Sequence, residues 1–325
     1  MAGTFGMFAL FYAQMAAADV RTISFPADKR YGHISAVGGI GSGQRRENLE
    51  RLEGHDRLLG YAQGKLKVNI PPGALCVFEP SPSLYLNARS VLGADPAGID
   101  GLKITYSGLE EGEEKVCDNF AKYVAHFKAL KMIRAKGSSL SDRGLQLLFP
   151  LPDLFSIDLS NTYISKSAVP LVLRYPKLGI VSFSNVDMHG ADFAKLANLP
   201  QLTSVALHNC CLDDADVKAI SACVQVGSLD ISKNPRITDA SLVSIKNMKK
   251  LECLDIDSTS VKTDALPVLK VLPLHLLNFD SGKVDMATAK KLFAAFPFLK
   301  NQKIVFPKMH GGVTNDEKML FAPTK

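Results

Sequence analysis

The sequence contains no tryptophan in 325 residues, and it lacks the patterns that mark several common classes of protein. No apolar run of about 18 or more residues lies inside its body, so nothing there is long enough to cross a membrane. The net charge of +6 is mild, and Lys and Arg form no run, which argues against a nucleic-acid-binding surface. Neither a G-x-S-x-G elbow nor a kinase, deaminase or Walker-type signature occurs. We therefore expect neither an enzyme nor a bound cofactor.

Metal-binding and disulfide frameworks are also missing. The seven histidines lie far apart in sequence and no metal-ligand spacing joins them, so no metal site is predicted. The cysteines form no C-x-x-C pair, and a chain this long would need a closer arrangement for a disulfide scaffold. We expect free thiols, with at least one disulfide as the alternative if the protein is exported. The six cysteines are Cys76, Cys117, Cys210, Cys211, Cys223 and Cys253.

A repeat fills the sequence over residues 97–306. Its clearest copy is Leu202–Cys210, which reads Leu-x-x-Val-x-Leu-x-x-Cys. From Leu130 to Leu299 the first positions of successive copies are separated by 24, 24, 24, 24, 25, 23 and 25 residues. A looser copy begins at Ile99. A period of about 20–29 residues is the signature of leucine-rich repeats.

Each repeat unit is predicted to contain a strand, a turn and a helix. Alternating apolar residues define the strand, and a small or amide residue at position nine, such as Asn234, can bond the turning backbone from inside the coil. Apolar residues three apart, such as Val217 and Ile220, give the helix one buried stripe. One unit cannot bury both its strand and its helix, so neighbouring units must stack. The sequence therefore predicts an α/β leucine-rich-repeat solenoid with a parallel concave sheet and convex helices.

Between strand and helix, each unit carries a residue at which the helix is expected to begin. Side-chain oxygens at such positions accept hydrogen bonds from the free amides of the first helical turn. The expected cap positions are Ser141, Ser165, His189, Asp213, Thr238, Lys262 and Asp285.

Three segments carry a resemblance to a known group of proteins. Ile237–Ile245 reads ITDASLVSI and resembles the "ITDAGLxxL" segment of bacterial, planctomycete-type leucine-rich-repeat proteins. Arg21–Gly32 and Leu59–Pro71 are similar to the N-terminal lead-in of that group. Because the group is largely of unassigned function, the resemblance implies an architecture and little about mechanism.

The first 18 residues differ in character from the rest. Residues 1–18 carry no charge and hold a short apolar core that ends in Ala16-Ala17-Ala18, so they resemble a secretory signal peptide. The expected location is then extracytoplasmic, periplasmic or secreted, and cytoplasmic if the segment is not a signal.

Residues 19–96 do not follow the repeat and are expected to form a small β-rich cap over the first repeat. Strands are predicted at Arg21–Pro26, His33–Val37 and Lys65–Ile70, and a helix at Glu47–Leu59. The glycines of 39–43 depart from the G-x-G-x-x-G spacing of a phosphate-binding turn, so we interpret them as a loop. Residues 307–325 are expected to be a loosely ordered tail.

The candidate binding surface is the open face of the sheet. Side chains at strand positions three, five and seven should point to solvent there, and their charges change along the chain. The N-terminal end is basic, the middle is small and neutral, and the C-terminal end is acidic. The candidate residues, in chain order, are Lys103, Arg134, Lys136, Asp158, His208, Asp230, Asp255, Asp257 and Asp280.

Small side chains leave room for a partner, and charges of opposite sign can orient it. The first hypothesis is a non-enzymatic recognition or scaffold protein that binds a protein or peptide on the concave face. The alternatives are an intracellular adaptor that presents a substrate to a partner enzyme, a plain solvated face, and an enzyme or weak cation binder that uses the acidic residues.

Overall fold

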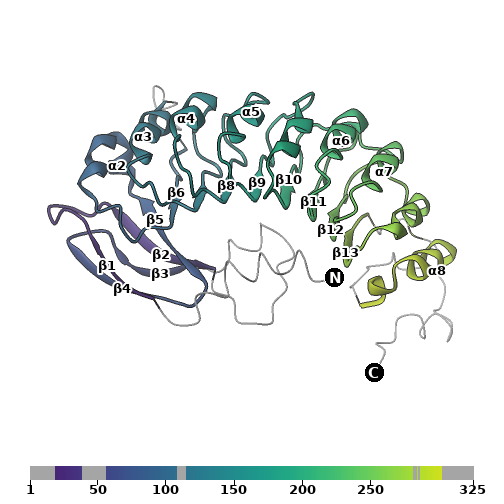
Figure 1. The fold of residues 1–325 in the computed structure, drawn as a ribbon, viewed down its shortest axis with the longest axis horizontal. Coiled ribbons are helices and arrows are strands. Elements are labelled where there is room, and N and C mark those ends of the chain that lie inside the picture. Colours follow the sequence, from purple (N-terminus) through teal and green to yellow (C-terminus); the bar gives the residue numbers. More distant parts are fainter. Residues whose placement is uncertain (1–18, 39–55, 108–114, 281–283, 285, 302–325) are drawn as a thin grey trace, which may run out of the picture. The chain divides into compact units, whose positions relative to one another are not determined.

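The computed structural model describes residues 19–38, 56–107, 115–280, 284 and 286–301 (Figure 1). The chain divides into two compact units, Met1–Ile164 with Arg174–Leu178, and Ser165–Leu173 with Gly179–Lys325. The expected signal peptide, the glycine-rich loop at 39–43 and the tail at 307–325 lie outside the described residues. No helix in the described ranges is long and apolar enough to span a membrane.

The first unit begins with five strands that do not follow the repeat. Strands β1 (Asp19–Ser24) and β4 (Lys65–Ile70) form an antiparallel two-stranded sheet. Strand β2 (Gly32–Gly38) pairs antiparallel with both β3 (Arg57–Tyr61) and β5 (Ala74–Pro80). Strands β1, β2 and β4 lie where strands were predicted, whereas β3 and β5 are additions to the prediction.

Strand β3 corrects part of the helix that we predicted over Glu47–Leu59. Arg57–Tyr61 is extended and lies beside β2, with Ile34 opposite Gly60. The charged local pattern was compatible with a helix, but pairing with a strand distant in sequence decides the conformation. The remainder of the predicted helix, residues 47–55, lies outside the described part of the chain.

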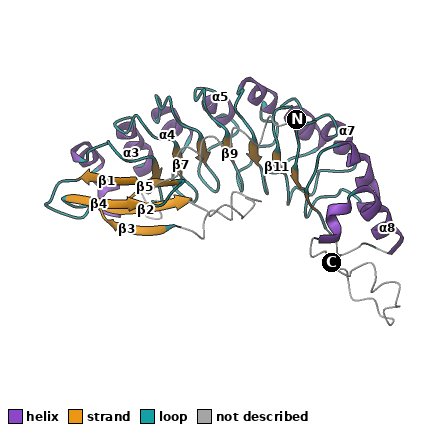
Figure 2. Ribbon diagram, turned by 60° about the horizontal axis from the view of Figure 1, so that its bottom comes forward, coloured by secondary structure: helices purple, strands orange, loops and turns teal. Residues whose placement is uncertain are grey.

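The repeat sheet of the first unit starts on β5. That strand runs parallel to β6 (Gly101–Lys103), and β7 (Met132–Arg134) and β8 (Ser156–Asp158) follow in the same direction. The helical segments of this unit are α2 (Pro82–Leu86), η2 (Ala88–Gly93), α3 (Val116–Val124) and α4 (Asp142–Leu147). In Figure 2 the helices of these repeats lie on the opposite side of the coil from their strands.

Asp100 fastens the first repeat to the strands that precede it. Its side chain is almost fully buried and accepts hydrogen bonds from the Cys76 amide at 3.0 Å and from Arg21 at 2.7 Å. Lys131 of the next repeat binds the other carboxylate oxygen at 3.0 Å. A buried carboxylate is tolerated when hydrogen bonds and opposite charges surround it, as they do here.

In the described part of the second unit the repeat strands run parallel. They are β9 (Ile180–Ser182), β10 (Ser204–Ala206), β11 (Ser228–Asp230), β12 (Cys253–Asp255) and β13 (Leu276–Asn278). Equivalent positions pair across neighbours, so Val205 lies opposite both Val181 and Leu229. The helical segments are α5 (Ala168–Val172), η3 (Phe193–Asn198), α6 (Asp214–Ile220), α7 (Ala240–Ile245), η4 (Thr263–Val271), α8 (Met286–Ala295) and η6 (Pro297–Asn301).

The core of each repeat follows the predicted alternation. In the repeat of β10, Leu202, Leu207 and Cys210 are fully buried, and Val205 is 1% exposed. The stripe residues Val217 and Ile220 of α6 are also fully buried. The leucine-rich-repeat fold that the period predicted is therefore confirmed.

A residue with a left-handed backbone conformation follows each central strand by three residues, where the chain turns toward the helix. The φ angle is +73° at Gly137, +53° at Asn209 and +54° at Lys233, which occupy the same repeat position. Gly and Asn adopt this conformation readily, whereas Lys does so at some cost. The other residues at this position with positive φ are Asn161, Asn185 and Ser258.

Candidate functional site

The acidic side chains of the second unit lie together on the sheet face. Register places Asp230 of β11 beside Asp255 of β12, and Asp255 beside Asn278 of β13. Asp257 follows Asp255 by two residues on the same face of the strand. Equivalent residues on neighbouring strands are about 5 Å apart, so these carboxylates are close enough to repel one another.

Local hydrogen bonds hold the three carboxylates in place. Asp230 accepts from the backbone amide of Ser232 at 3.0 Å and from its hydroxyl at 2.6 Å. Asp255 accepts from the Asp257 amide at 3.0 Å and from the side-chain amide of Asn278 at 2.9 Å. In the part of the chain that the structure describes, no Lys or Arg forms an ion pair with Asp230, Asp255 or Asp257.

The pKa of the Asp255 carboxyl is shifted by its surroundings. Burial raises the pKa of its carboxyl, and the neighbouring charges of Asp230 and Asp257 raise it further, against the hydrogen bonds from Asn278 and the Asp257 amide. Asp255 and Asp257 are half-buried, so they face solvent less fully than the sequence suggested. Asp280, the fourth acidic residue of the set, is exposed after β13.

The expected basic end of the face is changed by partners distant in sequence. Lys103 on β6 binds Glu79 at 3.2 Å and lies 3.6 Å from Asp56, and Arg134 on β7 binds Asp56 at 3.1 Å. Two of the three predicted cations are therefore paired with acidic residues of the N-terminal region. These pairs neutralise their charges, so the basic patch is weaker than the sequence predicted. The third, Lys136, is exposed.

The two remaining candidates have local partners. Asp158 on β8 accepts from the Ser160 amide at 3.0 Å. The Nδ1 atom of His208, just after β10, lies 2.8 Å from the Ser232 hydroxyl. His208 thus joins the same row of side chains as Ser232 and is half-buried rather than freely exposed.

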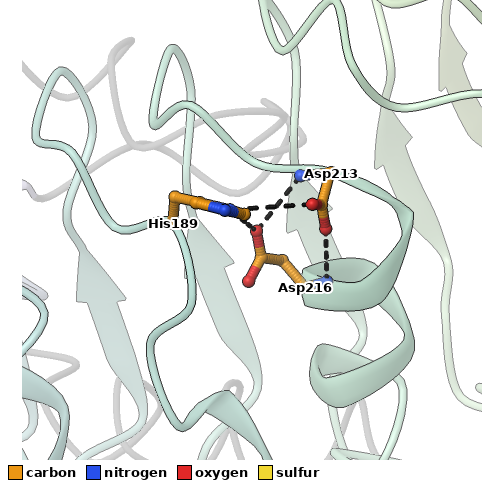
Figure 3. Close-up of side chains that lie close together, drawn as sticks. All are labelled: His189, Asp213 and Asp216. Atoms are coloured by element: carbon orange, nitrogen blue, oxygen red, sulfur yellow. Dashed lines mark hydrogen bonds and ion pairs between the residues drawn. The ribbon is translucent and has the colours of Figure 1, made fainter.

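A second cluster lies at the start of α6, away from the strands (Figure 3). The Nδ1 atom of His189 is 2.9 Å from Oδ2 of Asp216 and 3.7 Å from Oδ2 of Asp213. Asp213 is the cap of α6: its side chain accepts from the amides of Ala215 and Asp216, and Asp216 accepts in return from the Asp213 amide. This reciprocal arrangement is a capping box with Asp at the third helical position.

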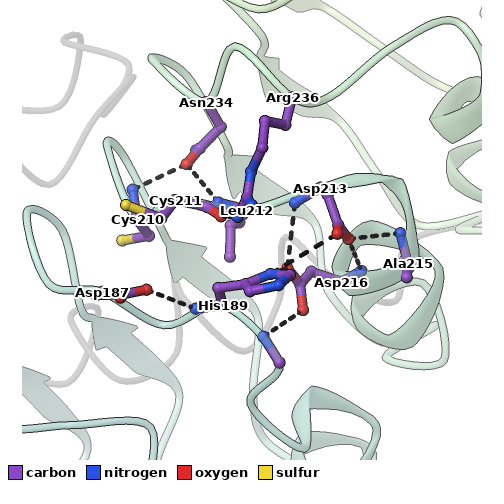
Figure 4. A network of polar contacts seen from close by, with 11 residues as sticks. Asp187, His189, Cys210, Cys211, Leu212, Asp213, Ala215, Asp216, Asn234 and Arg236 are labelled. Atoms are coloured by element: carbon purple, nitrogen blue, oxygen red, sulfur yellow. Dashed lines mark hydrogen bonds and ion pairs between the residues drawn. The ribbon is translucent and has the colours of Figure 1, made fainter.

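Asp216 also binds the neighbouring repeat. Its other oxygen accepts from the Gly190 amide at 2.9 Å, and its side chain is only 5% exposed (Figure 4). With Nδ1 protonated, His189 donates to the same carboxylate, so one buried acid receives three donors from two repeats. These bonds account for the positions of all three side chains, and the cluster ties adjacent repeats together.

One nitrogen and two carboxylate oxygens within 4.8 Å of one another also form a donor set of the kind that holds a divalent cation. Our sequence reasoning missed this grouping because it sought histidines close together in sequence. His189 and Asp213 occupy equivalent positions of consecutive repeats, 24 residues apart, and stacking brings them side by side. Both were predicted as helix caps; Asp213 caps α6, whereas η3 has Asp192 as its N-cap. A comparison of equivalent positions in neighbouring repeats could therefore have predicted this cluster.

All six cysteines lie in the described part of the chain, and no disulfide joins them there. Burial raises the pKa of Cys76 and of Cys210 to about 12, and that of Cys223 to about 11. Burial also raises the pKa of Cys117. These four buried thiols are poor nucleophiles, because the thiolate is the reactive form. Cys211 is exposed and Cys253 is partly exposed.

Comparison with known proteins gives sequence matches of limited extent. The chain is 37% identical over 86 residues to leucine-rich repeat-containing protein 42 of Bos taurus and of Homo sapiens, covering 24% of this chain and 20% of each relative. The match to the Mus musculus protein is 38% over 72 residues. The chain thus spans about a fifth of the length of the curated relatives that it matches. No family model matches it.

Two solved structures have similar repeats at low identity. An internalin, inlF, from Listeria monocytogenes has a TM-score of 0.41 at 13% identity, covering 69% of this chain and 70% of its own. Internalin C2 from the same organism has a TM-score of 0.39 at 14% identity, covering 61% of this chain and 92% of its own.

The resemblance to planctomycete-type proteins stays a prediction. The 24-residue period and the parallel strands together show that this chain has a leucine-rich-repeat fold.

Proposed function

We propose that this protein is a non-enzymatic recognition or scaffold protein that binds a Lys- or Arg-bearing segment of another protein on the sheet face of strands β10–β13. The observation that supports this proposal is the group Asp230, Asp255 and Asp257, which has no cationic partner among the described residues. Three carboxylates on adjacent strand positions repel one another, and an incoming ammonium or guanidinium group relieves that repulsion.

The surroundings of the acidic group suit an extended basic segment. Ser204, Ala206 and Ser228, on the adjoining strand positions, have short side chains that leave space above the sheet. The part of Asp255 that is already buried has lost some of its water, so a charged partner removes less hydration when it binds. Charge complementarity of this kind mainly raises the association rate and selects the partner.

A direct test uses a labelled Lys/Arg-rich peptide and a matched Asp/Glu-rich peptide as probes. We expect the wild-type protein to bind the basic peptide, with an affinity that falls as salt rises, and not the acidic one. Asp255→Lys with Asp257→Lys should weaken binding by about tenfold or more at low salt, because it reverses the local charge. Asp255→Asn with Asp257→Asn should give a smaller loss in the same direction.

The control is Asp192→Lys with Asp264→Lys, which makes the same change in net charge at two exposed positions, one directly before η3 and one in η4. It should leave binding near the wild-type value. Equal loss in both double variants would mean that the peptide responds to net charge alone, and unchanged binding in the first would leave the acidic group as solvated surface. Once a natural partner is known, stopped-flow association at low and high salt repeats the comparison.

A further inference from the structure

Cys253 and His275 bring a thiol and an imidazole together on the sheet face. Cys253 opens β12, and His275 directly precedes β13, the adjacent strand. The Sγ atom of Cys253 lies 3.4 Å from Nε2 of His275. On the other side of the ring, Nδ1 of His275 is 3.9 Å from Oε2 of Glu252. The three side chains stand in the order thiol, imidazole, carboxylate.

The backbone fixes this order. The amides of His275 and Leu276 both donate to the carbonyl oxygen of Glu252, at 2.9 and 3.2 Å. This is the regular bond between neighbouring repeats, so the placement of His275 beside Cys253 does not depend on a mobile loop. The side chains of His275 and Glu252 are 34% and 30% exposed, so a small molecule can reach the group.

His275 is placed to accept the thiol proton of Cys253. A cysteine beside a histidine can transfer its proton to the ring, and the resulting imidazolium stabilises the thiolate. Glu252 stabilises the imidazolium from the far side of the ring. Asp255, two residues along β12, and Asp230 on β11 carry negative charge that opposes the thiolate, whereas the ring of His275 lies at hydrogen-bond distance from the sulfur.

We propose that Cys253 is a reactive thiol and a modification site that takes low-molecular-weight disulfides by thiol–disulfide exchange. The thiol proton passes to Nε2 of His275. The thiolate sulfur attacks one sulfur of the disulfide R–S–S–R, whose S–S bond breaks as the Cys253–S–S–R bond forms. The leaving group departs as R–S⁻ and takes the proton from the imidazolium. The disulfide is the oxidant, and one R–SH is released for each Cys253 modified.

The chain supplies an internal reference in Cys211. This cysteine is exposed, and in the described ranges no hydrogen bond reaches its thiol. The test measures the modification rate of each cysteine in the full-length protein by peptide mass spectrometry, with glutathione disulfide and, separately, iodoacetamide as probes. Near pH 6, Cys253 should react about tenfold or more faster than Cys211, and its rate should fall less steeply as pH is lowered.

His275→Gln should remove this advantage and give Cys253 the pH profile of Cys211. Glu252→Gln should reduce it in part. His208→Gln changes another histidine of the same face, whose ring contacts the Ser232 hydroxyl, and it should leave the profile of Cys253 unchanged. The Cys210 thiol meets the backbone carbonyl of residue 208, which the substitution keeps. Urea unfolding of each variant checks that the fold is retained.

Equal rates and equal pH profiles for Cys253 and Cys211 in the wild-type protein would overturn the proposal, and so would a fast Cys253 in a folded His275→Gln variant. The wild-type comparison holds even if a variant fails to fold. The result is also independent of whether a basic partner binds the sheet face, since no peptide is present.

Discussion

Asp255 and Asp214, both in the second unit, have carboxyl pKa values that their surroundings shift in opposite directions. For Asp255, burial and neighbouring carboxylates raise the pKa. For Asp214, burial alone would raise the pKa, but hydrogen bonds from Ser241 and Thr238 outweigh it and lower the pKa. Thr238 donates to Asp214 from its amide at 2.8 Å and from its hydroxyl at 2.7 Å. The two residues should therefore respond to pH in opposite directions.

At Asp255 the folded state holds its proton more tightly than the unfolded state, whose aspartates titrate near pH 4. Stability therefore falls as pH rises through the folded pKa, because the ionised form is disfavoured in the fold. Asp255→Asn should raise the free energy of unfolding at neutral pH, and the gain should vanish at a pH well below about 4. Urea unfolding at several pH values measures this.

Asp214 is the matched comparison. Its folded pKa is lowered, so its contribution to stability is present above the unfolded value and is lost as pH falls through the folded value. Asp214→Asn should lower the free energy of unfolding at neutral pH, with a difference that shrinks in acid. The same sign of change in both variants would contradict the assignment of these two environments.

At the scale of one repeat, Asn234 organises the turn between strand and helix. It is fully buried, and its Oδ1 accepts from the amides of Cys210 and Leu212, at 2.9 and 3.0 Å. Its Nδ2 donates to the carbonyls of Leu207, Ile231 and Ser232 at 2.9–3.0 Å. One side chain thus satisfies backbone groups of two repeats, as expected for an amide at position nine.

Asn234→Ala leaves several of these buried backbone groups without partners. Since one buried unsatisfied group costs about 1–3 kcal/mol, we expect a loss of at least that size in the free energy of unfolding. The control is Thr259→Ala at the equivalent position of the next repeat. Its hydroxyl donates to the Ile256 carbonyl at 2.8 Å and accepts from the Val261 amide at 3.4 Å, fewer backbone partners than Asn234 has. Urea unfolding should show a clearly smaller loss there, and equal losses would refute the role of the amide.

At the scale of the whole chain, we propose that residues 1–18 direct export and are removed. The resemblance to a signal peptide rests on the uncharged apolar core that ends in Ala16-Ala17-Ala18. The first described strand, β1, begins at Asp19 and pairs with β4, Asp19 lying opposite Ile70. Cleavage before Asp19 would therefore leave this sheet intact.

N-terminal sequencing of the protein isolated from its native cells should find Asp19 or a residue close to it. Replacing Phe8 and Leu10 by Asp should keep the uncleaved chain in the cytoplasm, because a charged core no longer enters the export pathway. Recovery of a soluble protein that begins at Met1 would end the proposal of export.

The net charge of the whole chain says little about its surfaces. The sequence carries +6, yet the sheet face of β11 and β12 is acidic, and Lys103 and Arg134 are paired with acids. An overall charge describes long-range behaviour such as solubility, whereas recognition depends on which charges remain unpaired at one place.

The sequence by itself determined the repeat, the alternation of strand and helix and the buried residues. These features depend on periods of two and three to four residues within each unit and on an identical environment for each unit, so local pattern is enough. Leu207 and Asn234 are buried where the pattern places them. The adjacency of Asp230 and Asp255 also follows, because equivalent positions of stacked repeats must meet.

Only the tertiary structure decided how segments outside the repeat pattern pack against the repeats. Asp56 and Glu79 neutralise Arg134 and Lys103 because β3 and β5 join the repeat sheet, a pairing between residues as far as 78 positions apart. The strand at Arg57–Tyr61 has the same cause. Cys253 and His275 are 22 residues apart, two fewer than the usual repeat period of 24. They therefore do not occupy equivalent repeat positions, and the period did not predict their contact. Such contacts depend on long-range register and side-chain direction, which no local period encodes.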